Sequence, residues 1–108
     1  MHEVALATQI ARIVARHTPA PVRYVNITIG ARRGVVPASL TYAWNFVTSG
    51  TSLAGSTLQC TYQPAILACT TGHTSTIDDP RLPVCPLCQA SGTWVDENPF
   101  TVTSIDLA

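Results

Sequence analysis

The sequence has little charge and no excess of either sign. Charged residues make up 11% of the 108 residues, and the six basic residues, all of them arginine, are matched by six acidic ones. Residues 1–54 contain five arginines against Glu3, a balance of +4, whereas residues 55–108 contain Arg81 against five acids, a balance of −4. Because nucleic-acid binding depends on basic side chains that neutralise phosphates, this charge pattern argues against a nucleic-acid partner.

Long apolar runs and the common catalytic motifs are also missing. No run approaches the ~20 apolar residues of a membrane span, and the first residues lack the basic-then-apolar layout of a secretion signal. The sequence has no glycine-rich phosphate loop, no serine or cysteine in a nucleophile motif and no HExxH motif. We therefore expect a cytoplasmic protein without a membrane partner, and we do not expect an enzyme.

Apolar periodicity predicts two helices and three strands. Apolar residues recur at helical spacing in residues 3–17 and 37–49, and they alternate in residues 24–29 and from about residue 57 to 62. A third strand is expected at residues 100–107. These elements predict an α+β core whose inward residues are Leu6, Ile10, Ile13, Val14, Val25, Ile27, Ile29, Leu40, Ala43, Trp44 and Val47.

The sharpest motif lies between the second and third strands. Cys85-Pro-Leu-Cys88 is a CxxC pair, in which two thiolates one tight turn apart can hold one side of a tetrahedral ion, and Cys69 with His73 forms a CxxxH pair. The intervening residues include prolines that favour turns. In a reducing compartment such a cluster binds metal more often than it forms disulfides. The spacing therefore predicts a zinc loop inserted before the last strand.

Zinc in this loop is expected to be structural. Four protein ligands leave no open position for the water that a catalytic zinc requires. A redox CxxC pair would follow a strand and open a helix, whereas Pro83, Pro86 and Gly92 around Cys85 and Cys88 are typical of a turn. A redox dithiol and a loop without metal remain the alternatives.

Three further polar features have simple interpretations. Cys60 is expected to be a small core residue on the second strand, and zinc ligation is the less favoured alternative. The basic loop 31–34 is interpreted as a solvated turn, with an anion-binding corner as the alternative. The acidic pairs 78–79 and 96–97 are also interpreted as solvated turns.

The amino terminus offers a second set of metal ligands. In Met1-His2-Glu3, the terminal amine, the His2 amide and imidazole, and the Glu3 amide can surround one ion with four nitrogens in a plane. Square-planar nitrogen donation favours nickel(II) or copper(II). A histidine at position 2 is usually accidental, so these residues alone do not favour a nickel site.

Several segments, in order along almost the whole chain, resemble the HypA/HybF nickel-insertion proteins of hydrogenase maturation. The combination of an amino-terminal Met-His-Glu with a late zinc loop is the specific part of the resemblance. The matching residues are Met1-His2-Glu3, residues 30–37 with Leu40, Ala43 and Val47, Gly50-Thr51, Gly55, Asp79-Pro80 and residues 83–88.

The resemblance implies a two-part nickel metallochaperone. It places two helices on a three-stranded sheet in a nickel-binding domain, residues 1–64 plus 97–108, with an inserted zinc-binding domain at residues 65–96. Transported Ni(II) would bind at Met1, His2 and Glu3, apart from the structural Zn(II). The implied partners are the GTPase HypB and the large subunit of [NiFe]-hydrogenase, and some family members also serve urease.

The sequence departs from the family pattern at one zinc ligand. The first knuckle of the family is normally CxxC, which would place a cysteine at position 72, where this chain has Gly72. We expect His73 to complete a site with Cys69, Cys85 and Cys88, while water or Cys60 are the alternatives. A zinc-ribbon interaction module without nickel chemistry and a thiol oxidoreductase are the competing functions.

Overall fold

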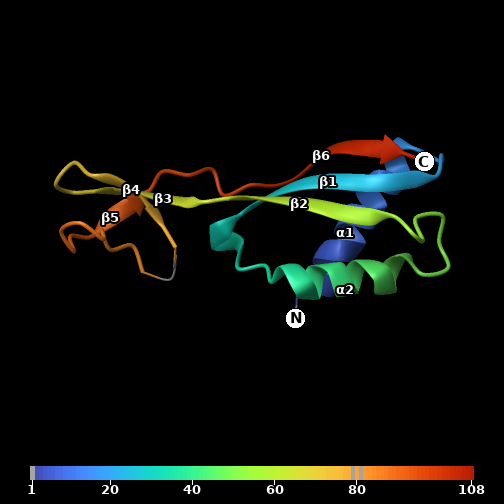
Figure 1. Ribbon diagram of the computed structural model, residues 1–108, viewed down its shortest axis with the longest axis horizontal. Coiled ribbons are helices and arrows are strands. Elements are labelled where there is room, and N and C mark those ends of the chain that lie inside the picture. Colours follow the sequence, from blue (N-terminus) through green and yellow to red (C-terminus); the bar gives the residue numbers. More distant parts are fainter. Residues whose placement is uncertain (1, 79, 81) are drawn as a thin grey trace. The chain divides into compact units, whose positions relative to one another are not determined.

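The computed structural model describes residues 2–78, residue 80 and residues 82–108. Its elements follow the chain in the order shown in Figure 1. They are α1 (Glu3–His17), β1 (Val22–Gly30), the 3-10 helix η1 (Ala31–Arg33), α2 (Pro37–Thr48), β2 (Thr57–Gln63), β3 (Ala65–Cys69), β4 (Thr74–Ile77), β5 (Gly92–Trp94) and β6 (Phe100–Leu107).

The strands form two sheets of three strands each, among the residues described. The first has the order β2-β1-β6 and the second has the order β4-β3-β5. The chain divides into one compact unit of Met1–Thr28, Val35–Thr61 and Thr101–Ala108, and another of Ile29–Gly34 and Tyr62–Phe100. The predicted α+β fold, with two helices on a three-stranded sheet and an insertion before the last strand, is confirmed.

The helices and the first sheet form the main core. The predicted inward residues of β1 are all buried, and α1 and α2 pack against each other. In α1, Ala7, Ile10 and Val14 are buried, whereas Ile13 is 38% exposed, so its predicted burial is wrong. The three-and-four spacing of Ala7, Ile10 and Val14 directs the inward stripe past Ile13.

Trp44 is the largest buried side chain of this core. It is 1% exposed, and its indole nitrogen donates hydrogen bonds to the hydroxyl and the carbonyl oxygen of Ser56, at 3.1 and 3.3 Å. A buried tryptophan N–H requires such a partner. The contact therefore ties the middle of α2 to the residue that precedes β2.

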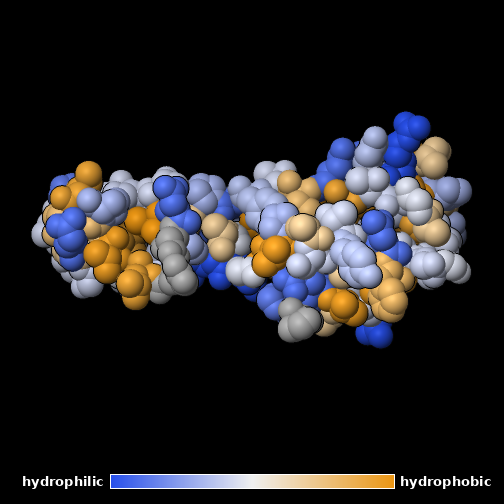
Figure 2. All heavy atoms as spheres, turned by 60° about the horizontal axis from the view of Figure 1, so that its bottom comes forward, coloured by the Kyte–Doolittle hydropathy of each residue, from blue (hydrophilic) through white to orange (hydrophobic). Residues whose placement is uncertain are grey.

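The second unit has a much smaller core. Its buried centre consists of Leu67, Cys69 and Cys85, which pack with the partly buried residues Ile77, Cys88, Ala90 and Trp94. Figure 2 shows apolar side chains on the surface of this part of the molecule, and Leu82 and Leu87 are 68% and 67% exposed. Because the described residues of the loop between β4 and β5 bury few apolar groups, burial alone contributes little to ordering it.

Candidate metal centre

Four side chains of the second unit converge on one point. The donor atoms of Cys69, His73, Cys85 and Cys88 all lie within 4.8 Å of one another. Cys69 is at the end of β3, where the alternation of buried residues places it on the same face as Leu67. These are the four residues for which the sequence predicted zinc ligation, and the fold brings all of them together.

The Cys69–His73 segment is a tight hairpin that joins β3 to β4. The Cys69 N–H donates to the His73 carbonyl oxygen at 2.9 Å, and the Gly72 N–H donates to the Cys69 carbonyl oxygen at 3.1 Å. Gly72 has φ +96°, the left-handed conformation that three-residue hairpin loops require. Cys69 and His73 therefore face each other across the hairpin, and the His73 N–H lies 3.4 Å from the Cys69 sulfur.

The second pair of ligands lies on a similar turn. The Gln89 N–H donates to the Cys85 carbonyl oxygen at 2.8 Å, and the Cys85 N–H donates to the Ala90 carbonyl oxygen at 2.8 Å. The Leu87 N–H lies 3.4 Å from the Cys85 sulfur. This turn places Cys85 and Cys88 beside the hairpin. Because it opens no helix, the geometry does not favour the redox interpretation.

The distances between donor atoms fit a tetrahedral zinc ion. The Nδ1 atom of His73 lies 3.5 Å from the Cys69 sulfur and 3.8 Å from the Cys85 sulfur, and the Cys69 and Cys88 sulfurs are 3.8 Å apart. Zinc bonds of about 2.3 Å to sulfur and 2.1 Å to nitrogen place donors about 3.6–3.8 Å apart at tetrahedral angles. Three sulfurs and one nitrogen at these separations form a donor set suited to structural zinc.

Hydrogen bonds within the cluster favour the negatively charged thiolate forms of Cys69 and Cys88, which attract a cation. Hydrogen bonding from the Thr71 hydroxyl, helped by the His73 N–H and opposed by burial, lowers the pKa of the Cys69 thiol to about 5. The same hydroxyl is the main cause of the lowered pKa of Cys88. The sulfurs of Cys88 and Cys69 raise the pKa of His73. A raised imidazole pKa means that protons compete more strongly with a metal ion for His73, so metal affinity falls as pH falls.

Cys60 is outside this centre. It is partly buried on β2, and it is absent from the described group of residues that could share one ion. The geometry thus favours His73, rather than Cys60, as the fourth ligand. Its position in the strand agrees with the interpretation as a core-facing residue.

Of the three predicted nickel-site residues at the amino terminus, the structure describes His2 and Glu3. Met1 lies outside the described residues. His2 is exposed and is the N-cap residue of α1. Glu3 is 6% exposed, and its carboxylate accepts a hydrogen bond from the Val36 N–H at 3.3 Å. The Glu3 carboxylate therefore connects the start of α1 to the start of α2.

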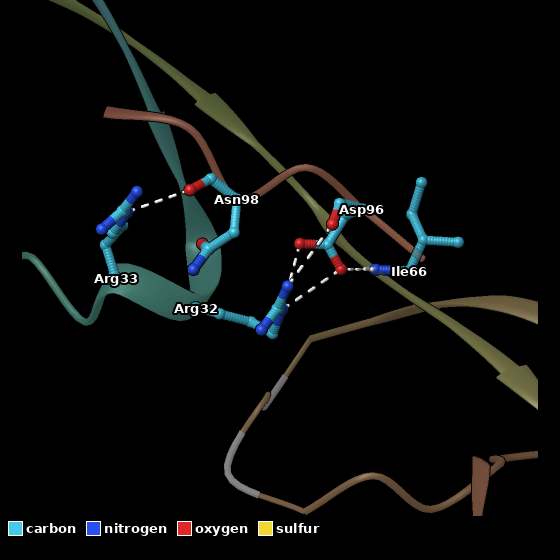
Figure 3. Close-up of polar contacts among 5 residues, drawn as sticks. All are labelled: Arg32, Arg33, Ile66, Asp96 and Asn98. Carbon is cyan, nitrogen blue, oxygen red and sulfur yellow. Dashed lines mark hydrogen bonds and ion pairs between the residues drawn. The ribbon is translucent and has the colours of Figure 1, made fainter. Parts of the chain in front are cut away.

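A polar cluster that the sequence did not predict lies in the same unit as the metal centre. The Arg32 guanidinium forms an ion pair with Asp96 at 3.0 Å, and the Asp96 carboxylate accepts the Ile66 N–H at 2.9 Å (Figure 3). Arg32 also lies over the Trp94 ring, 5.2 Å from its centroid, and the Asp96 side chain is 4% exposed. The solvated-turn interpretations of Arg32 and Asp96 are therefore wrong.

This cluster closes the base of the insertion. Asp96 precedes β6, Ile66 is the second residue of β3, and Arg33 donates a 2.9 Å hydrogen bond to the Asn98 carbonyl oxygen. Burial opposes ionisation of Asp96, but the Ile66 N–H and the Arg32 charge outweigh it and lower the pKa of the carboxyl group. An ionised Asp96 thus joins η1 to the segments that enter and leave the insertion.

Comparison with known proteins identifies the family. A family model described as hydrogenase/urease nickel incorporation, metallochaperone, hypA, matches residues 1–107. The hydrogenase maturation factor HypA of Desulfosudis oleivorans is 36% identical over 96 residues, which cover 83% of each chain. The HypA of Desulfatibacillum aliphaticivorans is 32% identical and is covered over 88% of its length by the whole of this chain.

A solved structure agrees with the fold. The solution structure of the Ni metallochaperone HypA from Helicobacter pylori aligns with a TM-score of 0.64 at 17% identity, covering 99% of this chain and 97% of that one. In the described residues, no helix is long and apolar enough to cross a membrane. From the family match and the two curated relatives, the chain belongs to the HypA family of nickel-incorporation metallochaperones.

Proposed function

We propose that this protein is a nickel metallochaperone that carries Ni(II) for the maturation of [NiFe]-hydrogenase. The observation that carries the proposal is the family match over residues 1–107 of a chain that begins Met1-His2-Glu3. In this role the protein is a carrier rather than an enzyme, and the nickel ion is its cargo. It acts in the cytoplasm, with a HypB-type GTPase and the hydrogenase large subunit as partners.

Nickel binds through nitrogen atoms at the amino terminus. The Met1 amine, the His2 amide and imidazole, and the adjacent Glu3 amide supply the planar donor set that Ni(II) favours. The exposed His2 side chain is accessible to solvent and therefore to an incoming ion. The Glu3 carboxylate adds negative charge beside these donors.

The position of these donors at the start of a helix also suits release. The amino end of α1 carries the positive end of the helix dipole, which repels a cation. Deprotonated amides and the Glu3 carboxylate offset that repulsion while the ion is bound. Protonation restores it, so nickel affinity falls as pH falls.

Nickel titration of two single-histidine variants tests the proposal. His2→Ala removes the imidazole ligand, and we expect it to abolish stoichiometric nickel binding in calorimetry on untagged protein. His17→Ala is the matched control, because His17 is also exposed and lies at the other end of the same helix. Full nickel binding by His2→Ala, or equal losses in both variants, would contradict the amino-terminal site.

We further propose that Cys69, His73, Cys85 and Cys88 hold one structural Zn(II). The support is the tetrahedral spacing of their donor atoms together with the small core of the insertion. The ion supplies a cross-link between two turns that bury little apolar surface, and in such sites the free energy of metal binding contributes to folding. Metal analysis of protein purified without chelators should find one zinc per chain, and fewer than about half an equivalent would count against the site.

A further inference from the structure

The hydroxyl group of Thr71, in the hairpin that joins β3 to β4, lies next to three of the metal-ligand atoms. Its hydroxyl oxygen lies 3.1 Å from the Cys69 sulfur, 3.2 Å from the Cys88 sulfur and 3.3 Å from the His73 Nδ1 atom. One side chain thus contacts donor atoms from both turns of the metal centre. Neither the ligand spacing nor the family match assigns a role to this residue.

The chemistry of these atoms determines the direction of the hydrogen bond. A hydroxyl has one proton to donate, whereas a thiolate can only accept. The Nδ1 atom of His73 lies 3.5 Å from the Cys69 sulfur and 3.8 Å from the Cys85 sulfur, so Nδ1 is the imidazole atom that would bind the ion. The proton of the Thr71 hydroxyl is then left for the Cys69 or the Cys88 sulfur.

A hydrogen-bond donor beside the ligand sulfurs would stabilise the net negative charge of the zinc-loaded centre. Three thiolates and a neutral imidazole around Zn(II) carry a net charge of −1, and hydrogen bonds to charged acceptors are the stronger class. Backbone N–H groups already lie 3.4 Å from the sulfurs of Cys69 and Cys85. The Thr71 hydroxyl adds a side-chain donor that also reaches Cys88.

We propose that Thr71 is a positioning residue of the zinc centre, whose hydroxyl donates a hydrogen bond to a ligand thiolate and holds the two turns together. This inference rests on the zinc site proposed above. The hydroxyl remains outside the coordination sphere, because the four ligands already complete a tetrahedron. Its role is to stabilise the thiolates and to restrict the hairpin to the geometry in which His73 reaches the ion.

The test compares Thr71→Val, Thr71→Ser and Thr70→Val in the full chain. Valine keeps the branched shape of threonine without the hydroxyl, serine keeps the hydroxyl without the methyl group, and Thr70 is an exposed neighbour on the same loop. Zinc affinity is measured by competition with a chromophoric chelator. The sulfur-to-metal charge-transfer band of the cobalt(II)-substituted protein reports the thiolates directly.

We expect Thr71→Val to weaken zinc binding about tenfold, the size of effect that hydrogen bonds to charged groups produce. The cobalt band should move to lower energy, because a thiolate without its hydrogen bond is a better electron donor. Thr71→Ser should restore both values, and Thr70→Val should change neither. A merely structural role for Thr71 would not move the band.

The outcomes separate this inference from the zinc site itself. Wild-type protein without zinc would overturn both proposals. Wild-type protein with one zinc, and Thr71→Val with affinity within about twofold and an unchanged band, would overturn only the role of Thr71. Equal losses in the valine and serine variants would also overturn it, because they would assign the effect to side-chain shape.

Discussion

The two turns of the metal centre differ by one residue. In each turn the backbone reverses at a residue with positive φ, Gly72 with φ +96° in the first and Gln89 with φ +60° in the second. The reversal occurs three residues after Cys69 but four residues after Cys85. The second ligand of the pair therefore follows the reversal in the first turn, as His73, and precedes it in the second, as Cys88.

This difference explains how the site accommodates the missing cysteine. At φ +96°, position 72 favours glycine, so a cysteine there would be strained. The residue after the glycine faces Cys69 across the hairpin, and from there an imidazole reaches the position of the fourth donor. Compared with the turn that carries Cys85 and Cys88, this turn thus reverses one residue earlier, and its second ligand is the longer imidazole side chain.

Of the substitutions considered, removal of His73 should cause the largest loss of zinc affinity, because His73 is the ligand that distinguishes the first turn from the second. His73→Ala takes away a donor atom, and we expect zinc affinity to fall by more than about a hundredfold, which exceeds the usual effect of residues outside the coordination sphere. Cys60→Ala is the matched control and should leave zinc affinity unchanged. Competition titrations with a chelator measure both. Normal zinc affinity in His73→Ala would assign the fourth position to water or another group.

Asp96 lies outside both turns, so its replacement should change the stability of the protein without distinguishing one turn from the other. Asp96→Asn removes the ion pair with Arg32, and we expect the free energy of unfolding at pH 7 to fall by about 1–3 kcal/mol. Urea unfolding measures the change. Glu97→Gln is the control, because Glu97 is the exposed neighbour and its change should have an effect within about 0.5 kcal/mol.

The effect of Asp96→Asn should depend on pH in a defined direction. The folded-state pKa of Asp96 is lowered, so its contribution is complete above the unfolded value of about 3.9 and is lost as pH falls through the folded value. The stability difference between the wild type and Asp96→Asn should therefore shrink below about pH 4. A difference that grows on acidification would contradict the ionised, paired Asp96.

The smallest expected effects on stability come from single substitutions at the two positive-φ residues, Gly72 and Gln89. Gly72→Ala forces a side chain into the left-handed region, and we expect it to lower the free energy of unfolding by about 1 kcal/mol. A Cβ atom at this position would meet no described atom within 4 Å, so the cost is conformational. Gln89→Gly relieves the same strain but adds freedom to the unfolded chain, so its net effect should be smaller.

Denaturant unfolding of the zinc-loaded variants distinguishes these two positions. If Gly72→Ala had no effect, the left-handed reversal would not explain the missing cysteine at position 72. The two turns would then differ only in their ligands.

The elements with regular periodicity could be predicted from the sequence, and the irregular ones could not. Residues 3–17 were expected to be helical, and α1 has these bounds, because its apolar stripe is sustained over 15 residues. The strands β3, β4 and β5 have three to five residues each, too few for an alternating pattern to stand out within a loop rich in turn residues.

The metal centre and the polar cluster show the same contrast. The four ligands follow from two local spacings, the CxxxH pair of Cys69 and His73 and the CxxC pair of Cys85 and Cys88. The pair of Arg32 and Asp96 could not be predicted, because 64 residues separate them in the sequence. A charged residue in a polar stretch looks solvated until the fold supplies its partner.

The central claim is that nickel is transported while zinc is structural. Its most direct test is to add a chelator to protein loaded with both metals. Untagged protein with one nickel and one zinc is mixed with a modest excess of chelator, and both metals are followed over time. Nickel should leave first and completely, while zinc and the native circular dichroism spectrum are retained. Loss of zinc before nickel, or retention of nickel after zinc has left, would contradict the assignment of carrier and structural roles to the two sites.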